Sequence, residues 1–186
     1  MGVFGNKLKL NEARESGGGV YFLPKKIKGP DPATGTAAEY DQGIYIVEID
    51  VTKMFDSRKK ETYFLAETLI KESNVPERSP GSRCSWMMDV NSDAAASNIR
   101  SLMIALTGSA LGQTLSSTEI EGEDWDAVGE AAVSGNRFKG VPLHVTAFYK
   151  LKKDKHPQGL DAAHDTNFYT RCLFNVVLPD AKEKAA

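Results

Sequence analysis

The sequence predicts a mainly β domain, in which five antiparallel strands close into a small barrel with one or two helices between the third and fourth strands. Three observations support this fold class. Apolar residues alternate with a period of two in five segments, the period changes to that of a helix between the third and fourth segments, and turns rich in Gly, Pro or Lys separate them. A sheet of five short strands must protect its two edges, and closure into a barrel with a helix across one end does so.

The chain of 186 residues suits one domain of ordinary size. Its 41% hydrophobic and 26% charged residues are typical of a globular protein and not of a disordered or fibrous one. Residues 1–42 contain a triple glycine and several prolines, which predict an N-terminal arm and loop. The barrel is expected over residues 43–178, and residues 179–186 form a short C-terminal tail.

The first two strands are predicted to form a hairpin. The first begins at Gly43 and ends near Phe55, a turn with the sequence SRKK occupies residues 57–60, and the second strand covers residues 61–73. Alternation divides each strand into two faces, but it does not say which face is the core. The apolar sets are Tyr45, Val47, Ile49 and Val51 in the first strand, and Phe64, Ala66, Thr68 and Ile70 in the second.

A third strand is predicted over residues 82–90, after a turn rich in proline and glycine. The clearest helix signal in the chain follows it. We expect Asp93 to cap this helix and Gly108 to end it. Its apolar residues recur at helical spacing, at Ile99, Leu102, Met103 and Leu106.

A second, acidic helix is predicted from about Glu121 to Val133, with Thr118 and Glu121 as a capping box. The fourth and fifth strands are predicted over residues 141–153 and 167–178, with a polar loop between them. The order is therefore three strands, one or two helices and two strands. This order is the layout of the oligonucleotide-binding (OB) barrel.

Positive charge is concentrated in a few segments, although the whole chain has 23 Lys and Arg against 25 Asp and Glu. Residues 149–156 hold four lysines and one aspartate, a formal charge of +3, and residues 24–29 hold three lysines, also +3. Residues 119–130 instead carry six carboxylates and no cation. Lysine-rich turns attract a polyanion, but they also keep loops soluble and protect sheet edges, so both interpretations stay open.

In the OB barrel, nucleic acid crosses the second and third strands and is clasped by the loops that join strands 1 to 2 and 4 to 5. These two loops are the lysine-rich ones in this chain. Single strands are held by cations along the phosphates and by aromatic rings that stack on bases. The predicted phosphate partners are Lys53, Arg58, Lys59, Lys60, Arg83, Lys150, Lys152, Lys153 and Arg171. The predicted stacking residues are Phe55, Tyr63 and Tyr149. Trp86 is a further candidate, but its neighbours Cys84, Met88 and Val90 favour burial.

Two stretches also resemble a known family. They are GIYIVEIDVTKMFDSRKKETYFLAETLIKESN, which begins at Gly43, and PGSRCSWMMDVNSDAAASNIRSLMIALTG, which ends at Gly108; the likeness continues more weakly to Val177. They are similar to small bacteriophage replication-module proteins of the OB-fold, single-stranded-DNA-binding type. The resemblance implies a sequence-independent single-stranded-DNA-binding protein that acts in phage DNA replication or recombination. It further implies the cytoplasm of a bacterial host, and phage or host replication and recombination proteins as partners.

One feature departs from that family. Many of its members end in an acidic tail that recruits partners, whereas this chain ends in LPDAKEKAA. The acidic residues 119–130 are either a substitute surface for partners or a solvated helix face.

No catalytic motif is found, so we expect no enzyme activity, no cofactor and no metal. His144, His156 and His164 lack a companion nucleophile motif, and Cys84 and Cys172 form no pair of the CxxC type. No apolar run approaches the roughly 20 residues that span a bilayer, and the start of the chain lacks the apolar stretch of a signal peptide. We therefore expect a cytosolic protein with no membrane partner.

Three functions are compatible with the sequence. The first is sequence-independent binding of single-stranded DNA. The alternative is a phage adaptor or virion component that uses a small β-barrel for protein contact, with the lysine turns serving only as edge protection. The third is a recombination mediator or annealing protein, which needs the same groove as the first. Salt-dependent retention on single-stranded DNA separates the first from the alternative.

Overall fold

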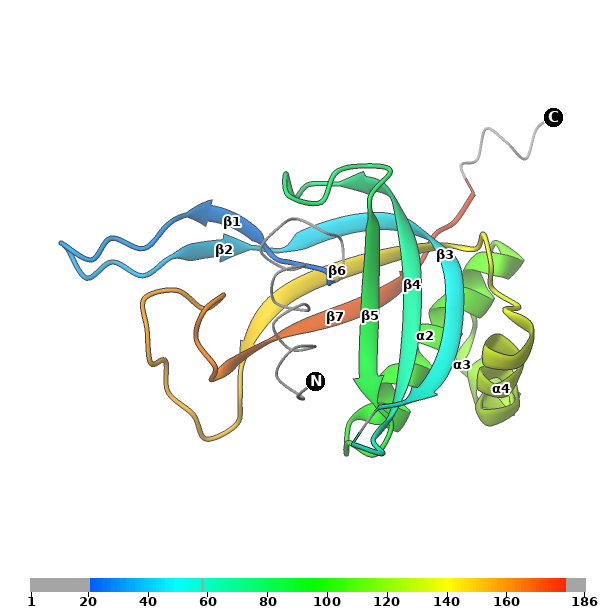
Figure 1. The fold of residues 1–186 in the computed structure, drawn as a ribbon. Coiled ribbons are helices and arrows are strands. Elements are labelled where there is room, and N and C mark those ends of the chain that lie inside the picture. The colour runs from blue at the N-terminus through cyan, green and yellow to red at the C-terminus, as the bar shows by residue number, and fades with distance from the viewer. Residues whose placement is uncertain (1–20, 58, 180–186) are drawn as a thin grey trace.

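The computed structural model describes residues 21–57 and 59–179, which form a mainly β structure with helices on one side (Figure 1). Its body is a five-stranded antiparallel sheet. The strands are β3 (Gly43–Asp56), β4 (Thr62–Ser73), β5 (Arg83–Asp89), β6 (Pro142–Leu151) and β7 (Phe168–Val176).

The strands lie in the order β5-β4-β3-β6-β7, and each neighbouring pair is antiparallel. The long strand β3 is central, because its first half pairs with β6 and most of its length pairs with β4. β3 bends between these two partners and curves the whole sheet (Figure 1). The predicted mainly β class, the five antiparallel strands and the helical segment between the third and fourth of them are confirmed.

The sheet is not closed into a barrel, so the predicted barrel is not confirmed. Within the described ranges, no ladder of hydrogen bonds joins β5 to β7, the two outer strands. Instead, Tyr21 forms a parallel bridge with Ser85 of β5. A segment that precedes the sheet in the chain thus occupies part of the edge that closure would need.

Burial shows which face of the first hairpin is the core. The alternating sets that begin at Tyr45 in β3 and at Phe64 in β4 are buried, as far as Ile49 and Ile70. Val51 departs from the predicted pattern. The register of β3 against β4 shifts between Ile49 and Val51, so Thr52 faces the core in place of Val51.

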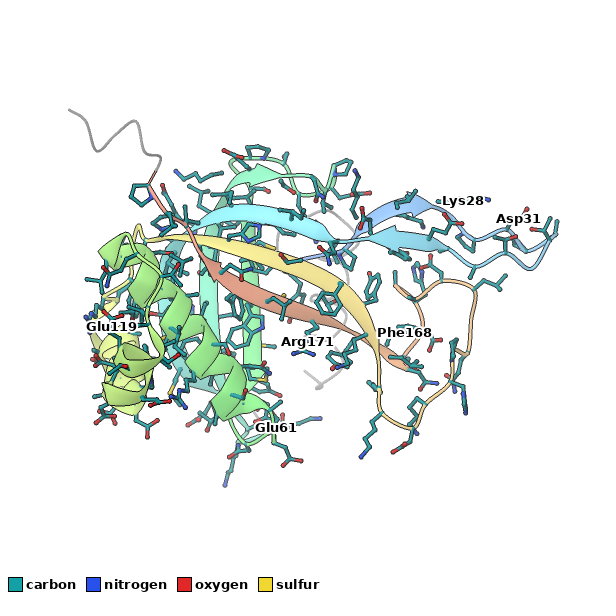
Figure 2. The ribbon with its side chains drawn as sticks, turned by 180° about the vertical axis from the view of Figure 1, so that it is seen from behind. Lys28, Asp31, Glu61, Glu119, Phe168 and Arg171 are labelled. Atoms are coloured by element: carbon teal, nitrogen blue, oxygen red, sulfur yellow. The ribbon has the colours of Figure 1, made fainter. Side chains whose placement is uncertain are left out.

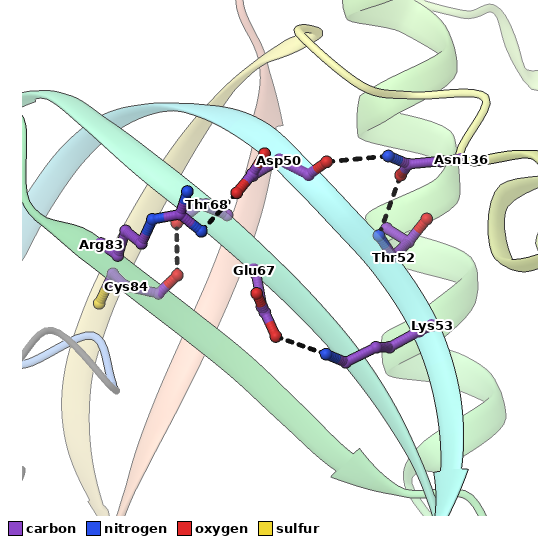
Figure 3. A network of polar contacts seen from close by, with 8 residues as sticks. All are labelled: Asp50, Thr52, Lys53, Glu67, Thr68, Arg83, Cys84 and Asn136. Carbon is purple, nitrogen blue, oxygen red and sulfur yellow. Dashed lines mark hydrogen bonds and ion pairs between the residues drawn. The ribbon is translucent and has the colours of Figure 1, made fainter.

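Polar contacts hold this irregular part of β3 against the end of helix α4 (Trp125–Gly135). The Thr52 hydroxyl donates to the Ala132 carbonyl at 2.6 Å, and the Thr52 N–H donates to the Asn136 side-chain oxygen at 3.1 Å. The Asn136 amide in turn donates to the Asp50 carbonyl at 2.8 Å (Figure 3). These bonds satisfy backbone groups next to the register shift, where the strand ladder is irregular.

Helix α2 (Ala95–Leu111) packs against β6 and β7 and is the helix that the apolar spacing predicted. Both predicted ends are wrong. The N-cap is Ala94, not Asp93, and no side chain caps the helix. Gly108 lies inside the helix, and Gly112, with a left-handed φ of 67°, ends it.

The acidic segment forms two helices, not one, and they lie beside α2 (Figure 1). The first is α3 (Ser117–Gly122), whose capping box consists of Ser116 and Glu119. The predicted box at Thr118 and Glu121 is therefore wrong. The second is α4, which begins with an aspartate cap of its own.

The predicted N-terminal arm contains a second, smaller sheet. Strands β1 (Lys25–Lys28) and β2 (Glu39–Asp41) pair as an antiparallel hairpin that projects away from the body (Figure 1). Near its tip, the Asp31 N–H donates to the Thr36 carbonyl at 2.9 Å. The rest of that predicted arm, residues 1–20, lies outside the described residues, as do residues 180–186 of the predicted tail.

Candidate nucleic-acid interface

The opening between the edges of β5 and β7 contains a pocket of about 440 Å³. Below it, the two strands meet through side chains, since the Trp86 and Phe174 rings pack edge to face with centroids 5.1 Å apart. The pocket is lined by Tyr21, Phe22, Ser85, Trp86, Met87, Met88, Asn98, Phe168, Tyr169, Thr170, Arg171 and Cys172. We call it the seam pocket.

Tyr21 and Phe22 line one side of this opening, and several contacts hold the segment 21–23 in place. The Tyr45 hydroxyl donates to the Leu23 carbonyl at 2.6 Å and accepts from the Leu23 N–H at 3.1 Å. Phe22 is 2% exposed and packs edge to face on the Tyr45 ring. Gly43 permits this approach, because a Cβ there would lie 2.0 Å from the Leu23 oxygen.

Arg78 fixes the same segment from the connection between β4 and β5. Its side chain is fully buried, and its Nε donates to the Tyr21 carbonyl at 3.0 Å. A second bond runs to the Glu77 carbonyl, while Nη2 has no hydrogen-bond partner in the described part of the chain. Cys84 lies beside it; burial raises the pKa of this thiol to about 12, although the guanidinium acts in the opposite direction.

The turn between β3 and β4 presents its lysines to solvent. The Ser57 N–H donates to the Glu61 carbonyl at 2.8 Å, and the Lys60 N–H donates to the Ser57 carbonyl at 2.9 Å. Lys60 has a left-handed φ of 62°, and both Lys59 and Lys60 are exposed. The predicted phosphate partner Arg58 lies outside the described residues.

Phe55 and Tyr63 flank this turn as a stacked pair of rings. Their centroids are 5.7 Å apart, with 24° between the ring planes. Phe55 is 37% exposed, and the Tyr63 hydroxyl donates to the Glu61 carboxylate at 2.9 Å, which raises the tyrosine pKa. Both predicted stacking residues therefore lie on the outer face of the sheet, next to the exposed lysines.

Two other predicted phosphate partners are paired with carboxylates on the outer face. The Lys53 Nζ lies 2.7 Å from Glu67, and an Arg83 Nη lies 2.5 Å from Asp50 (Figure 3). These pairs cancel charge that a phosphate would otherwise meet. The structure therefore places Lys53 and Arg83 in local ion pairs, which sequence patterns did not reveal.

The loop between β6 and β7 carries the second set of lysines. Lys150 near the end of β6 is exposed, as are Lys152 and Lys153 at the start of the loop, and the Lys152 Nζ donates to the Thr166 carbonyl at 2.7 Å. No carboxylate pairs with these three lysines among the residues that the structure describes. Asp165, only 8% exposed, accepts backbone N–H groups within the loop, which lower its pKa. The lysines thus project from an ordered loop.

Asp161 joins this loop to the β1–β2 hairpin. Its carboxylate accepts from the Tyr40 hydroxyl of β2, from the Lys26 Nζ of β1 at 3.4 Å and from the Ala163 N–H at 3.0 Å. Burial acts to raise the pKa of Asp161, but these hydrogen bonds outweigh it and lower the pKa. The predicted stacking residue Tyr149 lies at the same junction and packs edge to face on Tyr40 at 4.8 Å.

The remaining two predicted residues lie at the seam pocket. Trp86 is 9% exposed and belongs to the core, where its ring contacts those of Phe64 and Phe174, so little of it is open to a base. Arg171 is on β7 and lines the pocket (Figure 2). No ion pair or hydrogen bond of its side chain is found within residues 21–57 and 59–179.

The topology places the two lysine-rich turns at opposite ends of the seam pocket. Tyr63, two residues beyond the first turn, pairs with Asp89 at the end of β5, and the second loop leads directly into Phe168 at the start of β7. The pocket is lined by the part of β5 nearest the first turn and by the part of β7 nearest the second loop. The acidic helices, which carry Glu119, lie at the other side of the molecule (Figures 1 and 2).

Sequence reasoning did not place Asn98 of α2, Met87 of β5, or Phe168 and Tyr169 of β7 at a common site. Phe168 and Tyr169 were identifiable as aromatic residues of a strand. Nothing in the sequence, however, indicated that the edges of β5 and β7 stay apart.

The described residues contain no group of three or more His, Cys, Asp or Glu side chains placed to hold a metal ion. None of the helices in the same ranges combines the length and apolar character that a membrane crossing requires. No family model matches the chain, and no curated protein is significantly similar to it.

Proposed function

We propose that this protein binds single-stranded DNA without sequence preference, along a path from the β3–β4 turn, across the edges of β5 and β7, to the β6–β7 loop. In this proposal the sheet is an OB-type fold whose order of strands is that of the barrel and whose last seam is open. The proposed role is in phage DNA replication or recombination, in the cytoplasm of the host, as the family resemblance of residues 43–108 implies.

One observation carries the proposal: a pocket with aromatic walls lies between two exposed lysine turns. Lys59 and Lys60 stand at one end, and Lys150 and Lys153 at the other. The lysines neutralise phosphates on both sides of the pocket, and the rings between them offer stacking surfaces. A polyanion with exposed flat bases meets both requirements.

The same geometry favours a single strand over a duplex. Stacking on Phe55 and Tyr63, or entry into the seam pocket, requires a base whose face is not covered by its neighbours. In a duplex those faces are stacked, so only the phosphate contacts remain available. Binding to duplex DNA is therefore expected to be weaker at the same salt concentration.

The test is a salt titration of binding by fluorescence anisotropy, with labelled single-stranded and duplex DNA of one length. The wild-type protein should prefer the single strand. In the double variant Lys150→Ala, Lys153→Ala, the slope of log affinity against log salt should fall by roughly 0.7 for each lost contact. The variant Lys59→Ala, Lys60→Asn should do the same, with Asn chosen because it tolerates the left-handed φ of position 60.

Lys139→Ala is the matched control, since this exposed lysine lies in the connection between α4 and β6. It should leave affinity and slope unchanged. Equal changes for all three variants would mean a general charge effect and not a defined path. If the wild-type protein does not bind single-stranded DNA at low salt, that result would favour the alternative function as an adaptor or virion component.

A further inference from the structure

Arg171 differs from the ion-paired cations of the sheet. Lys53, Lys71 and Arg83 each have a carboxylate partner at 2.5–2.8 Å. Arg171 is partly buried in the wall of the seam pocket and, within the described part of the chain, no partner of its guanidinium is found. A guanidinium that is partly removed from water and has no acceptor among the described residues is available to a ligand that brings oxygen or ring-nitrogen acceptors.

Asn98 offers a second polar group to the same space. It lies in the first turn of α2 and is partly buried, and its side-chain amide makes no hydrogen bond to any residue in the described ranges. An amide has two donors and one acceptor, which match the edge of a nucleobase. None of the described Asp or Glu residues lines the pocket, so none of them repels a strand of phosphates there.

The remaining walls suit a flat, polarisable ring. Tyr169 is 42% exposed at the rim, and Phe168, Met87 and Met88 contribute rings and thioethers. The volume of about 440 Å³ lies within the roughly 300–1,000 Å³ range of sites that enclose small organic groups. Apolar walls with a few convergent polar groups are the usual composition of such sites.

We propose that the seam pocket is a base-binding subsite, in which a nucleobase flipped out of the bound strand stacks on Tyr169 and is hydrogen-bonded by Asn98 and Arg171. This inference rests on the proposed function, because the lysine turns bring the strand to both ends of the pocket. It separates two roles: the turns hold phosphates, and the pocket holds a base.

The first experiment compares a thymidine oligonucleotide with an abasic oligonucleotide of the same length and charge. The wild-type protein should bind the thymidine strand at least about tenfold more tightly, which corresponds to about 1.4 kcal/mol. Tyr169→Ala and Asn98→Ala should reduce this preference several-fold, and neither should change the salt slope. Arg171→Gln should reduce the preference as well.

Matched controls lie close to each position. Leu173→Ala removes a side chain of the same β7 strand that is also 42% exposed but does not line the pocket. Ser97→Ala is next to Asn98 on α2, and Arg100→Gln removes an exposed cation of the same helix. These variants should bind both oligonucleotides as the wild-type protein does, and thermal melts identify any variant that fails to fold.

A second readout locates the base directly. A strand that carries 5-iododeoxyuridine should crosslink under light to Phe168 or Tyr169, as read by mass spectrometry. Crosslinks at Phe55 or Tyr63 alone would overturn the subsite. So would equal affinity for thymidine and abasic strands, while DNA binding itself would stand. Loss of binding to both strands in the wild-type protein would instead overturn the proposed function.

Discussion

At the scale of residues, the cations of this protein differ in whether a carboxylate neutralises them. Lys53 and Arg83 are close to Glu67 and Asp50, whereas Lys59 and Lys60 have no such partner among the described residues. Ion pairs this exposed contribute little to stability, roughly 0–1 kcal/mol, but they change which charges a phosphate meets. Lys150 of β6 and Lys152 and Lys153 of the following loop likewise have no carboxylate partner in the described part of the chain.

The stacked ring pair leads to a prediction at the same scale. Tyr63→Ala should weaken binding of single-stranded DNA by roughly 1–3 kcal/mol and leave the salt slope unchanged, because a base that leaves a ring releases no counterions. Tyr63→Phe keeps the ring and loses only the bond to Glu61, so it should bind like the wild-type protein. Anisotropy titrations at several salt concentrations measure both quantities. Weaker binding by Tyr63→Phe would assign the effect to the hydroxyl instead.

The sequence predicted these residues better than it predicted their surroundings. Alternation correctly grouped Tyr63 apart from Phe64, because side-chain direction follows from local strand geometry. It was unable to predict that Glu67 neutralises Lys53, since that pair depends on the register between two strands. Trp86 shows the same limit: only the packed structure reveals that Phe64 and Phe174 cover it.

At the scale of elements, the side chain of Asp161 in the β6–β7 loop holds the β1–β2 hairpin against that loop. The pKa of this carboxyl is lowered in the folded protein, so its contribution to docking is present above its unfolded pKa of about 3.9 and is lost as pH falls through the lower folded value. The hairpin, with its lysines at positions 25, 26 and 28, is thus held against the β6–β7 loop at neutral pH.

Asp161→Asn should detach the hairpin from the loop at neutral pH, because an amide accepts the bonds from Tyr40 and Lys26 more weakly than a carboxylate does. Cleavage by trypsin after Lys26 or Lys28 should become faster, as measured by mass spectrometry over time. Asp154→Asn, in the same loop, serves as the control, because the Asp154 side chain makes no hydrogen bond or ion pair with any of the described residues. Equal cleavage rates in the wild-type protein and Asp161→Asn would show that the other contacts suffice.

Turn chemistry at element ends was the weakest part of the sequence prediction. Gly108 has the composition of a helix stop, but it is required inside α2, where a Cβ would lie 2.7 Å from Val176 of β7. The helix continues past Gly108 and ends at Gly112, which has a left-handed φ of 67°. Local propensity does not carry this information, since the reason for the glycine is a tertiary contact.

At the scale of the whole molecule, residues 21–23 decide how the sheet ends. These residues dock against Gly43 and Tyr45 of β3 and against Arg78 of the β4–β5 connection. The order of the strands was predictable from the periods of the sequence. The open seam was not, because the segment that occupies the edge of β5 has no strand pattern of its own.

Gly43→Ala should destabilise the protein by roughly 1–3 kcal/mol, the usual range for overpacking, because a Cβ would collide with the Leu23 oxygen. Gly129→Ala in α4 is the control: nothing lies within 4 Å of its Cβ position, so helix propensity should stabilise the protein by roughly 0.5–1 kcal/mol. Urea unfolding followed by circular dichroism measures both changes. Unchanged stability in Gly43→Ala would show that residues 21–23 add little to the fold.

The contacts that dock residues 21–23 also determine the order in which parts of the chain fold. Leu23 is 22 residues away from Tyr45, and Tyr21 is 57 residues away from Arg78, so this early-synthesised segment has nowhere to dock until β3, β4 and the connection to β5 have formed. Contacts over such separations form slowly, because closing the intervening loop costs chain entropy. Until then the edge of β5 is bare, and a second chain competes for it at a rate that rises with concentration. We therefore expect the yield of refolding to fall as the protein concentration during refolding rises.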